Sequence, residues 1–317
     1  MKILDSTVTR EALPFPELID ALREMFIEGC HVPLRHNHKI ATASDEGTVL
    51  IMPAWQDGRY LGIKTVNVFP GNAARGLPGL HSTYVLYDAR TGAPLAQLDG
   101  NEITSRRTAA ASALAASYLA RKTASRMTLL GAGRVGSLVP QAYRAVLPIR
   151  EVDVWDAVPA ASERLVARLN GLGFHARVVD NLPESVARAD VVTSATLATE
   201  PVVRGEWLAP GSHLDLIGSF TPAMREADDA CFMNATLFVD TAEAFQKSGD
   251  LLGPLQRHVV TDPQRWPTLE ALCRGQAPGR TNDTERTVFK AVGTALEDLA
   301  AAALVYERRG DTAVSHE

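Results

Sequence analysis

A glycine-rich segment that directly follows an apolar run is the first candidate for chemistry in this chain. Residues 127–130 are Met-Thr-Leu-Leu, typical of a buried strand, and residues 131–136 are Gly-Ala-Gly-Arg-Val-Gly. Gly131 permits a tight turn, Gly133 lets backbone N–H groups approach a pyrophosphate, and Gly136 lets a helix sit close to the sheet. This pattern predicts a dinucleotide site at a helix N-terminus. The alternative is a glycine turn that binds nothing.

An acidic residue about 20 positions after the glycine-rich segment favours the interpretation as a dinucleotide site. A helix predicted over residues 135–146 leads to a strand over 151–155, which ends at Asp156, 20 residues after Gly136. A carboxylate there can accept hydrogen bonds from a ribose diol and repels a 2′-phosphate, so we expect NAD in preference to NADP. Arg134 could offset this preference. The residues of this segment expected to contact the cofactor are Gly131, Gly133, Arg134, Val135, Gly136 and Asp156.

Two further loops should face the same ligand, because ligands of doubly wound sheets bind outside the carboxyl ends of the strands. Ser194, Ala195 and Thr196 follow the strand residues 190–193. Ser219 follows a strand predicted at 213–217. We expect both loops to line the nicotinamide, and the alternative is that they are ordinary strand-end loops.

Three basic residues in the first third of the chain are candidates for binding an anionic substrate: Arg35, Lys64 and Arg107. Lys64 lies inside the apolar run 62–66, where its side chain faces either a cleft or solvent. Arg107 precedes an alanine-rich stretch, where a salt bridge on a helix surface is the alternative role. A bidentate arginine with a lysine point charge is well suited to a carboxylate.

The histidines and cysteines give weaker indications. His31, His36 and His38 are clustered, but a metal site needs convergent ligands, so we expect surface residues and no metal. His81 is a candidate for substrate contact. The three cysteines are far apart and odd in number, which argues against a disulfide framework and fits a reducing cytoplasm.

The composition is that of a soluble globular protein of about two domains. The chain has 317 residues, of which 46% are hydrophobic and 22% charged. A net charge of −5 does not suggest a nucleic acid or an anionic membrane as partner. We expect no signal peptide, because charges run through the first residues, and no membrane span, because no apolar run is long enough.

The residue patterns change along the chain, which predicts two kinds of domain. Residues 17–28 have helical spacing, and residues 35–87 contain strand-like segments separated by turn clusters such as 44–47. The second of these regions predicts a mostly antiparallel sheet. Residues 101–121 are predicted to form a long helix that leads into the second domain.

From residue 127 onward strands and helices alternate, which is typical of a doubly wound parallel sheet. Residues 160–169 are predicted to form one of the helices, and residues 284–308 are predicted to form one long helix that packs back on the first domain. The predicted fold class is therefore α/β: a Rossmann sheet domain with a discontinuous α+β domain. The predicted strands are 127–131, 151–156, 174–179, 190–194, 213–217 and 236–240.

Several segments together resemble the ornithine cyclodeaminase/μ-crystallin family, over roughly residues 35–310. The resemblance implies a homodimer, a Rossmann domain at 119–283 that binds NAD(H) or NADP(H), and a substrate-binding and dimerisation domain formed by 1–118 and 284–317. The segments that carry it are Gly62–Asn67, Pro70–Asn72, Thr91–Ala96, Leu98–Gly100, Thr104–Ala113, Gly131–Gly136, Ile217–Ser219 with Glu226, and Phe289-Lys290 with Gly293 and Asp298.

The resemblance also implies roles for single residues. Arg35, Lys64 and Arg107 match the residues that hold the substrate α-carboxylate. Thr108 matches a phosphate contact. The chain departs from ornithine cyclodeaminases in the loop after the fifth Rossmann strand, where they have an aspartate and this chain has Phe220. A carboxylate near the amines assists proton transfer and positions the cation, whereas phenylalanine suits an apolar ring.

This departure favours the reduction of a cyclic ketimine carboxylate, such as 1-pyrroline-2-carboxylate or 1-piperideine-2-carboxylate, to L-proline or L-pipecolate. We expect Arg107 and Lys64 to be the catalytic residues, with His81 and Phe220 in contact with the substrate. Lys64 is the first candidate for a proton donor, although a substrate that reacts as the iminium needs none. Ornithine cyclodeamination, amino-acid dehydrogenation and a non-enzymatic nucleotide-binding role stay open as alternatives.

Overall fold

The computed structural model describes residues 1–41 and 46–310. The chain divides into two compact units: unit 1 is Met1–Arg107 with the segment from Thr294 onward, and unit 2 is Thr108–Gly293. The boundaries predicted from sequence were 118/119 and 283/284. Part of the turn predicted at 44–47, and residues 311–317 of the predicted C-terminal segment, lie outside the described residues.

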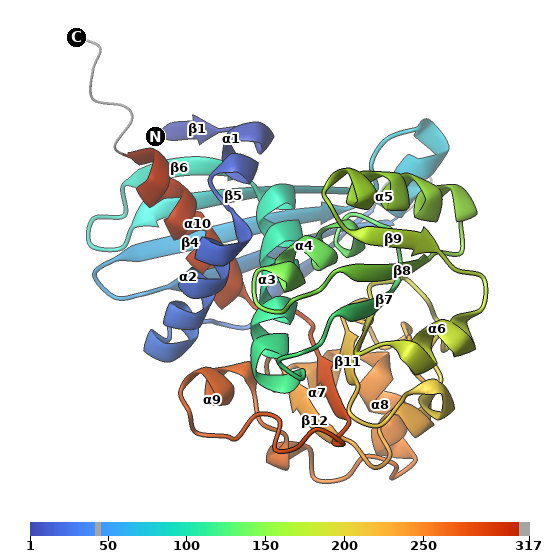
Figure 1. The fold of residues 1–317 in the computed structure, drawn as a ribbon. Coiled ribbons are helices and arrows are strands. Elements are labelled where there is room, and N and C mark those ends of the chain that lie inside the picture. Colours follow the sequence, from blue (N-terminus) through green and yellow to red (C-terminus); the bar gives the residue numbers. More distant parts are fainter. Residues whose placement is uncertain (42–45, 311–317) are drawn as a thin grey trace. The chain divides into compact units, whose positions relative to one another are not determined.

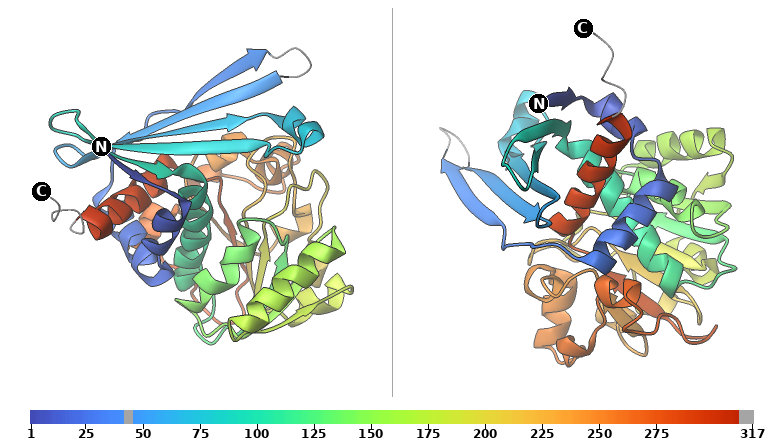
Figure 2. Two further views of the ribbon diagram at one scale, coloured as in Figure 1. Left: turned by 90° about the horizontal axis from the view of Figure 1, so that it is seen from above. Right: turned by 90° about the vertical axis from the view of Figure 1, so that its left-hand side faces the viewer.

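Unit 1 is a six-stranded sheet with helices on one face (Figures 1 and 2). Its strand order is β1-β6-β5-β4-β3-β2, and every neighbouring pair is antiparallel except β1 and β6. The prediction of a mostly antiparallel sheet is therefore confirmed. The strands are β1 (Lys2–Leu4), β2 (His36–Ala41), β3 (Glu46–Trp55), β4 (Tyr60–Val68), β5 (Leu80–Asp88) and β6 (Pro94–Asp99).

Helix α10 (Ala295–Gly310) packs on β3, β4 and β5, and α2 (Phe15–Glu28) packs on α10. The short helix α1 (Ser6–Glu11) begins at Asp5, whose carboxylate accepts a hydrogen bond from the N–H of Val8. Helix α3 (Gly100–Leu119) begins in unit 1 and continues into unit 2. It corresponds to the long helix predicted over 101–121.

Burial alternates along the central strands of unit 1, so the sheet has one packed face and one half-exposed face. In β4, Gly62, Lys64 and Val66 are buried, whereas Ile63 and Thr65 between them are partly exposed. Successive side chains of a strand point to opposite faces. Because α10 packs on β4, the buried set that includes Lys64 is the set that faces the helices.

Unit 2 is a seven-stranded sheet in which every described pair of neighbouring strands is parallel, in the order β12-β13-β11-β10-β7-β8-β9 (Figure 1). The predicted doubly wound sheet is confirmed. Its strands are β7 (Arg126–Leu130), β8 (Glu151–Trp155), β9 (His175–Val178), β10 (Val191–Ser194), β11 (His213–Leu216), β12 (Thr236–Val239) and β13 (Thr287–Lys290). Its further helices are α4 (Val139–Arg144), α5 (Pro159–Gly171), α6 (Leu182–Arg188), α7 (Ala244–Lys247), α8 (Gly249–Gln256) and α9 (Leu269–Cys273).

The strand order of unit 2 reverses between β7 and β10. From β7 the chain moves outward through β8 to β9, and it then returns to place β10 on the other side of β7. Doubly wound sheets bind ligands outside the carboxyl ends of the strands at such a reversal. The glycine loop follows β7, and Ser194 ends β10, so the two predicted cofactor loops leave the sheet at this point.

The prediction of one long helix over residues 284–308 is wrong. Residues 287–290 form β13, which pairs with β11 and β12, and α10 begins only at Ala295. The segment Thr-Val-Phe-Lys is buried along its whole length, and its β-branched and aromatic residues suit a central strand. Gly293, with a φ of 78°, turns the chain before the helix. The helix predicted over 135–146 is also shorter, because a single 3₁₀ turn precedes α4.

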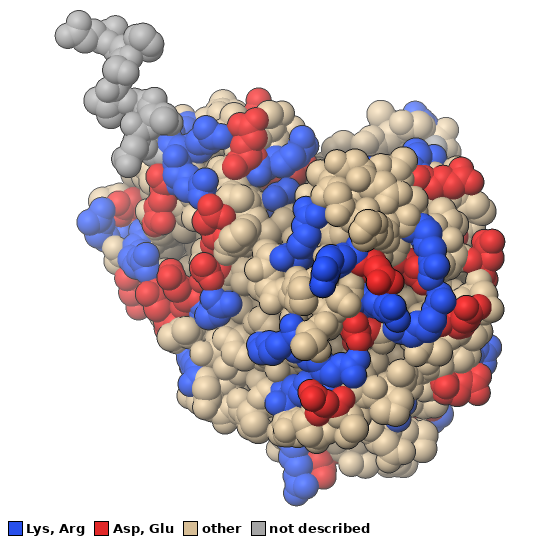
Figure 3. Space-filling view, viewed as in Figure 1, with Lys and Arg blue, Asp and Glu red and all other residues tan. Residues whose placement is uncertain are grey.

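Charges of both signs are interspersed on the face drawn in Figure 3. Surface ion pairs in unit 2 include Arg177 with Asp153 at 2.7 Å and Arg225 with Asp229 at 2.6 Å. Such partly exposed pairs contribute little to stability individually. Within the described residues, no helix combines the length and the apolar character that crossing a membrane requires.

Candidate active site

The glycine loop has the local geometry that its sequence requires. Gly131 has a φ of 98°, which other L-residues rarely adopt, and a Cβ there would lie 2.6 Å from the carbonyl oxygen of Ala195. A Cβ on Gly136 would overlap the carbonyl oxygen of Gly131. A Cβ on Gly133 would meet no heavy atom within 4 Å. Two of these glycines are therefore needed by the fold, whereas Gly133 borders open space.

The chain after the loop begins as a 3₁₀ turn and continues as α4. The N–H of Ser137 donates to the carbonyl oxygen of Gly133 at 2.9 Å, and the N–H of Leu138 donates to that of Val135 at 2.9 Å. Gly133 and Arg134 are exposed, and Val135 is half-buried. The helical turn thus starts directly beside the exposed part of the loop.

Asp156, the residue that follows β8, is held against the glycine loop. Its Oδ2 accepts a hydrogen bond from the N–H of Ala132 at 2.7 Å, and its Oδ1 accepts one from the N–H of Val158 at 2.8 Å. The side chain is partly exposed. A carboxylate oxygen has two lone pairs, so each oxygen can still accept a further hydrogen bond. The sequence prediction placed a ribose contact at this residue.

The loops after β10 and β11 present their serine side chains inward. The hydroxyl of Ser194 donates to Glu226 Oε1 at 2.6 Å, and the hydroxyl of Ser219 donates to the carbonyl oxygen of Met224 at 2.6 Å. Both serines are fully buried. Of the predicted loop contacts, Ala195 and Thr196 are the ones whose side chains are partly exposed.

In unit 1, the structure brings Lys64 and Arg107 together around one carboxylate. The Nζ of Lys64 lies 2.5 Å from Oδ2 of Asp298, and the Nε of Arg107 lies 2.9 Å from Oδ1 of the same residue. The Nη1 of Arg107 lies 2.5 Å from Oε2 of Glu297. Lys64 is 2% exposed and Arg107 is 6% exposed. Neither cation is therefore a solvent-facing surface residue.

Burial changes the acid–base properties of this cluster. It lowers the pKa of Lys64 to about 8, because the loss of water outweighs the attraction of Asp298, and the charges of Arg107 and Arg35 lower it further. Burial alone would raise the pKa of Asp298, but the charges of Lys64 and Arg107 outweigh it and lower that pKa. Arg35 thus lies within electrostatic range of Lys64, whereas Lys64 and Arg107 are the two cations that contact the carboxylates.

The other predicted site residues lie elsewhere. His81 is exposed and pairs with Asn67, so it lies on the sheet face opposite to Lys64, whose partner on β5 is Tyr84. Phe220 follows β11 in unit 2 and is 51% exposed. Thr108 is the first residue of unit 2, half-buried on α3. The roles proposed for these residues stay predictions.

Sequence reasoning named Asp298 only as part of the family resemblance, and it identified neither Asp298 nor Glu297 as a partner of the cations. Glu297 and Asp298 lie in the first turn of α10, where carboxylates interact favourably with the helix N-terminus. The predicted helix over 284–308 placed them in its middle and so hid this signal. An acidic pair four and five residues after Gly293 is the sequence feature that could have revealed the helix start.

Two glycine variants should separate the role of the loop in folding from the dinucleotide binding that its sequence predicts. Gly136→Ala pushes a methyl group into a backbone carbonyl and should lower the free energy of unfolding by about 1–3 kcal/mol. Gly133→Ala should change that free energy by less than about 0.5 kcal/mol. It should nevertheless weaken NADH binding about tenfold, equivalent to about 1.4 kcal/mol. Urea unfolding and NADH fluorescence titration measure the two effects, and equal destabilisation by both variants would contradict these roles.

Comparison with known proteins agrees with this architecture. The sequence profile of the ornithine cyclodeaminase/mu-crystallin family matches residues 3–313. The chain is 38% identical over 295 residues to the Delta(1)-pyrroline-2-carboxylate reductase of Paracoccus denitrificans, covering 92% of each protein.

Two solved structures resemble the chain over its whole length. One is the Delta(1)-pyrroline-2-carboxylate reductase of Thermococcus litoralis in complex with NADH and L-proline, with a TM-score of 0.92, 32% identity and coverage of 100% of both chains. The other is an archaeal alanine dehydrogenase dimer with bound NAD, with a TM-score of 0.90, 31% identity and coverage of 100% of this chain and 98% of that one. The chain therefore belongs to the ornithine cyclodeaminase/mu-crystallin family.

Proposed function

We propose that this protein is an NAD(P)-dependent oxidoreductase that reduces a cyclic ketimine carboxylate to the corresponding cyclic amino acid. The proposed substrates are 1-pyrroline-2-carboxylate and 1-piperideine-2-carboxylate, and the products are L-proline and L-pipecolate. The buried cation cluster is the observation that supports this most. Lys64 and Arg107 are desolvated together beside Glu297 and Asp298, and the charge of Arg35 also acts on Lys64. Such a cluster suits a monocarboxylate.

Unit 2 supports the cofactor part of the proposal. The exposed Gly133, the contact between the glycine loop and Ala195, and the carboxylate of Asp156 together suit a dinucleotide, with NAD favoured over NADP. When bound, the nicotinamide supplies the hydride, and the protein binds and orients both reactants. The residues proposed to hold the cofactor are Thr108, Gly131, Gly133, Arg134, Val135, Gly136, Asp156, Ser194, Ala195, Thr196 and Ser219.

Imine reduction adds a hydride to the imine carbon and a proton to the nitrogen. Lys64 is the proposed source of the proton, because a pKa of about 8 leaves the ammonium form dominant at neutral pH while allowing it to release a proton. Asp298 holds the Nζ of Lys64 and so positions this proton. When the substrate enters as the iminium, the same ammonium group acts through its charge alone.

Phe220 supports imine reduction over cyclodeamination of ornithine. It offers an apolar ring and no carboxylate for a distal amine, and it is half-exposed in the loop after β11. The Thermococcus relative bound to NADH and L-proline is consistent with this choice. The alanine dehydrogenase relative supports an amino-acid dehydrogenase as the second candidate. A non-enzymatic nucleotide-binding role would not require a buried carboxylate-binding cluster.

We also propose that the protein forms a homodimer through the half-exposed face of the unit 1 sheet. Pro53, Ile63 and Val85 form a row across β3, β4 and β5 on that face, and each is partly exposed. Among the described residues of unit 1, the helices pack on the opposite face. An apolar sheet face of this kind is suited to a second copy. The alanine dehydrogenase relative is a dimer.

A substrate panel scored by NADH consumption tests the proposed reaction. We expect turnover with 1-pyrroline-2-carboxylate and 1-piperideine-2-carboxylate, and none with pyruvate plus ammonia. L-Ornithine should release no ammonia. Arg107→Lys should lower kcat/KM for the imines about 100-fold, because lysine lacks the planar set of donors that can reach Glu297, Asp298 and a substrate carboxylate together. The exposed Arg90→Lys variant should leave kcat/KM unchanged. Ammonia release from ornithine without imine reduction would reject the proposal.

The pH profile tests the role of Lys64. Because its pKa is lowered to about 8, the ammonium form dominates below that pH, and kcat/KM for imine reduction should fall as the pH rises through about 8. Lys64→Arg keeps a positive charge that an arginine does not lose near neutral pH, so this variant should be slower but should lack the fall near pH 8. The same fall in both proteins would assign it to the substrate iminium instead.

The cofactor preference tests Asp156. Asp156→Ala removes the carboxylate that repels a 2′-phosphate, so the ratio of kcat/KM for NADH to that for NADPH should fall about tenfold. Steady-state kinetics with both cofactors measure this ratio. Glu163→Ala, on the exposed surface of α5, is the control. An unchanged preference in Asp156→Ala would count against its assignment as the ribose ligand.

A further inference from the structure

We propose that Glu226 is a positioning residue that ties the loops after β10 and β11 together and thereby sets the geometry of the nicotinamide end of the cofactor site. This inference rests on the proposed function, because it assigns those loops to the nicotinamide. Glu226 comes from neither loop and is fully buried, so it has no direct access to a ligand. Its effect on the reaction is therefore indirect.

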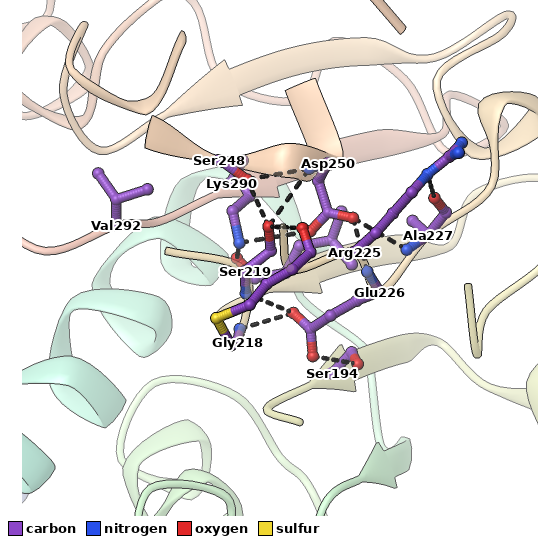
Figure 4. Close-up of polar contacts among 12 residues, drawn as sticks. Ser194, Gly218, Ser219, Arg225, Glu226, Ala227, Ser248, Asp250, Lys290 and Val292 are labelled. Carbon is purple, nitrogen blue, oxygen red and sulfur yellow. Dashed lines mark hydrogen bonds and ion pairs between the residues drawn. The ribbon is translucent and has the colours of Figure 1, made fainter. Parts of the chain in front are cut away.

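The carboxylate of Glu226 accepts five hydrogen bonds, and its two oxygens serve different loops. Figure 4 shows this carboxylate between Ser194 on one side and Gly218 and Ser219 on the other. Oε1 accepts from the hydroxyl of Ser194 at 2.6 Å, the N–H of Thr196 at 2.7 Å and the hydroxyl of Thr196 at 2.8 Å. Oε2 accepts from the N–H groups of Gly218 at 2.6 Å and Ser219 at 3.3 Å. One side chain thus bridges the ends of two neighbouring parallel strands.

The donor set requires the ionised form of Glu226. Three of the five donors are backbone N–H groups, which cannot accept a proton in return. Burial raises the pKa of this carboxyl above its ordinary value, and the charge of Asp250 adds to that rise, while the charge of Lys290 and the bond from Ser194 only partly oppose it. If either oxygen were protonated, its O–H group would face a backbone N–H group, and neither of the two can accept a hydrogen bond from the other. The arrangement of the two loops therefore depends on the negative charge of Glu226.

The backbone of Glu226 is fixed from the opposite side. The N–H groups of Glu226 and Ala227 donate to Oδ1 of Asp250 at 2.7 and 3.0 Å. The other oxygen of Asp250 lies 3.5 Å from Nζ of Lys290, which donates to the carbonyl oxygen of Leu216 at 3.0 Å. Asp250 and Lys290 are fully buried. The backbone of Glu226 is therefore connected through Asp250 to strands β13 and β11. Glu226 thus has little freedom to move with a displaced loop.

Close packing at Gly218 shows that the two loops meet at this carboxylate. A Cβ on Gly218 would overlap the carbonyl oxygen of Thr196 and would lie 2.5 Å from Oε1 of Glu226. The loop after β10 also contacts the glycine loop, because a Cβ on Gly131 would lie 2.6 Å from the carbonyl oxygen of Ala195. The loop after β10 therefore adjoins both other segments predicted to hold the cofactor, whereas the glycine loop is held separately by its bond to Asp156.

The hydroxyls of Ser194, Thr196 and Ser219 all donate within the protein, so other backbone groups, the side chain of Ala195 and the methyl group of Thr196 are left to contact a nicotinamide. These groups are well placed only while the carboxylate holds them. Misplacement of a reactant by about 1 Å can cost about 100-fold in rate. The expected result of losing Glu226 is thus a poorly oriented nicotinamide with the adenosine end still bound.

Glu226→Gln tests this inference at nearly constant shape. The glutamine amide has one acceptor oxygen, so its NH2 group must face an N–H donor of one loop or the other. NADH should bind about tenfold more weakly, and kcat should fall, whereas ADP-ribose, which lacks the nicotinamide, should bind as it does to the unaltered protein. Glu163→Gln, on the exposed surface of α5, is the matched control and should leave both ligands unaffected.

Isothermal titration with NADH and ADP-ribose separates the outcomes. The positioning role would be overturned if Glu226→Gln weakened the binding of NADH and of ADP-ribose equally, or if it changed neither NADH binding nor kcat. Failure of the unaltered protein to bind NADH would instead reject the proposed function. If Glu226→Gln does not fold, Ser194→Ala removes one donor at a fully buried position. That variant should also weaken the binding of NADH selectively, but by a smaller factor. Equal weakening of NADH and ADP-ribose binding would again overturn the inference.

Discussion

Ionised side chains that leave water must be matched by opposite charges and hydrogen bonds, and both candidate sites of this protein depend on that requirement. In unit 1, Asp298 is shared by Lys64 and Arg107. In unit 2, every oxygen of the Glu226 carboxylate has donors, and Lys290 supplies the nearby positive charge. Each buried charge thereby fixes several chain segments at once, which is the precision that a site for orienting two reactants needs.

Burial of the unit 1 cluster affects both how strongly its cations attract an anion and how readily Lys64 releases a proton. Removal from water strengthens the attraction of the cations for a carboxylate and at the same time lowers the pKa of Lys64 to about 8. A lysine in solvent would keep its proton through the neutral range and would be screened by salt. The same burial therefore accounts for both proposed tasks, holding an anion and releasing a proton.

Prediction from sequence succeeded where a structural feature depends on residues that are close together in the chain. The turn at Gly131 and the close packing at Gly136 are local requirements, and the alternation of strands and helices is a pattern within short windows. Residues 284–308 were misassigned because a short apolar segment has no period that distinguishes a strand from a helix. Their strand state follows from the gap between β11 and β12, which is a property of the assembled sheet.

By itself, the sequence determined the glycine loop, the acid at position 156 and the family, since each depends on residues close together in the chain or on a matching pattern along it. Only the tertiary structure decided which charges are buried together. Arg107 meets Asp298 across 191 residues, and Glu226 meets Ser194 across 32. The pairing of charges is decided by the free energy of desolvation, which exists only once distant segments have folded against each other and excluded water.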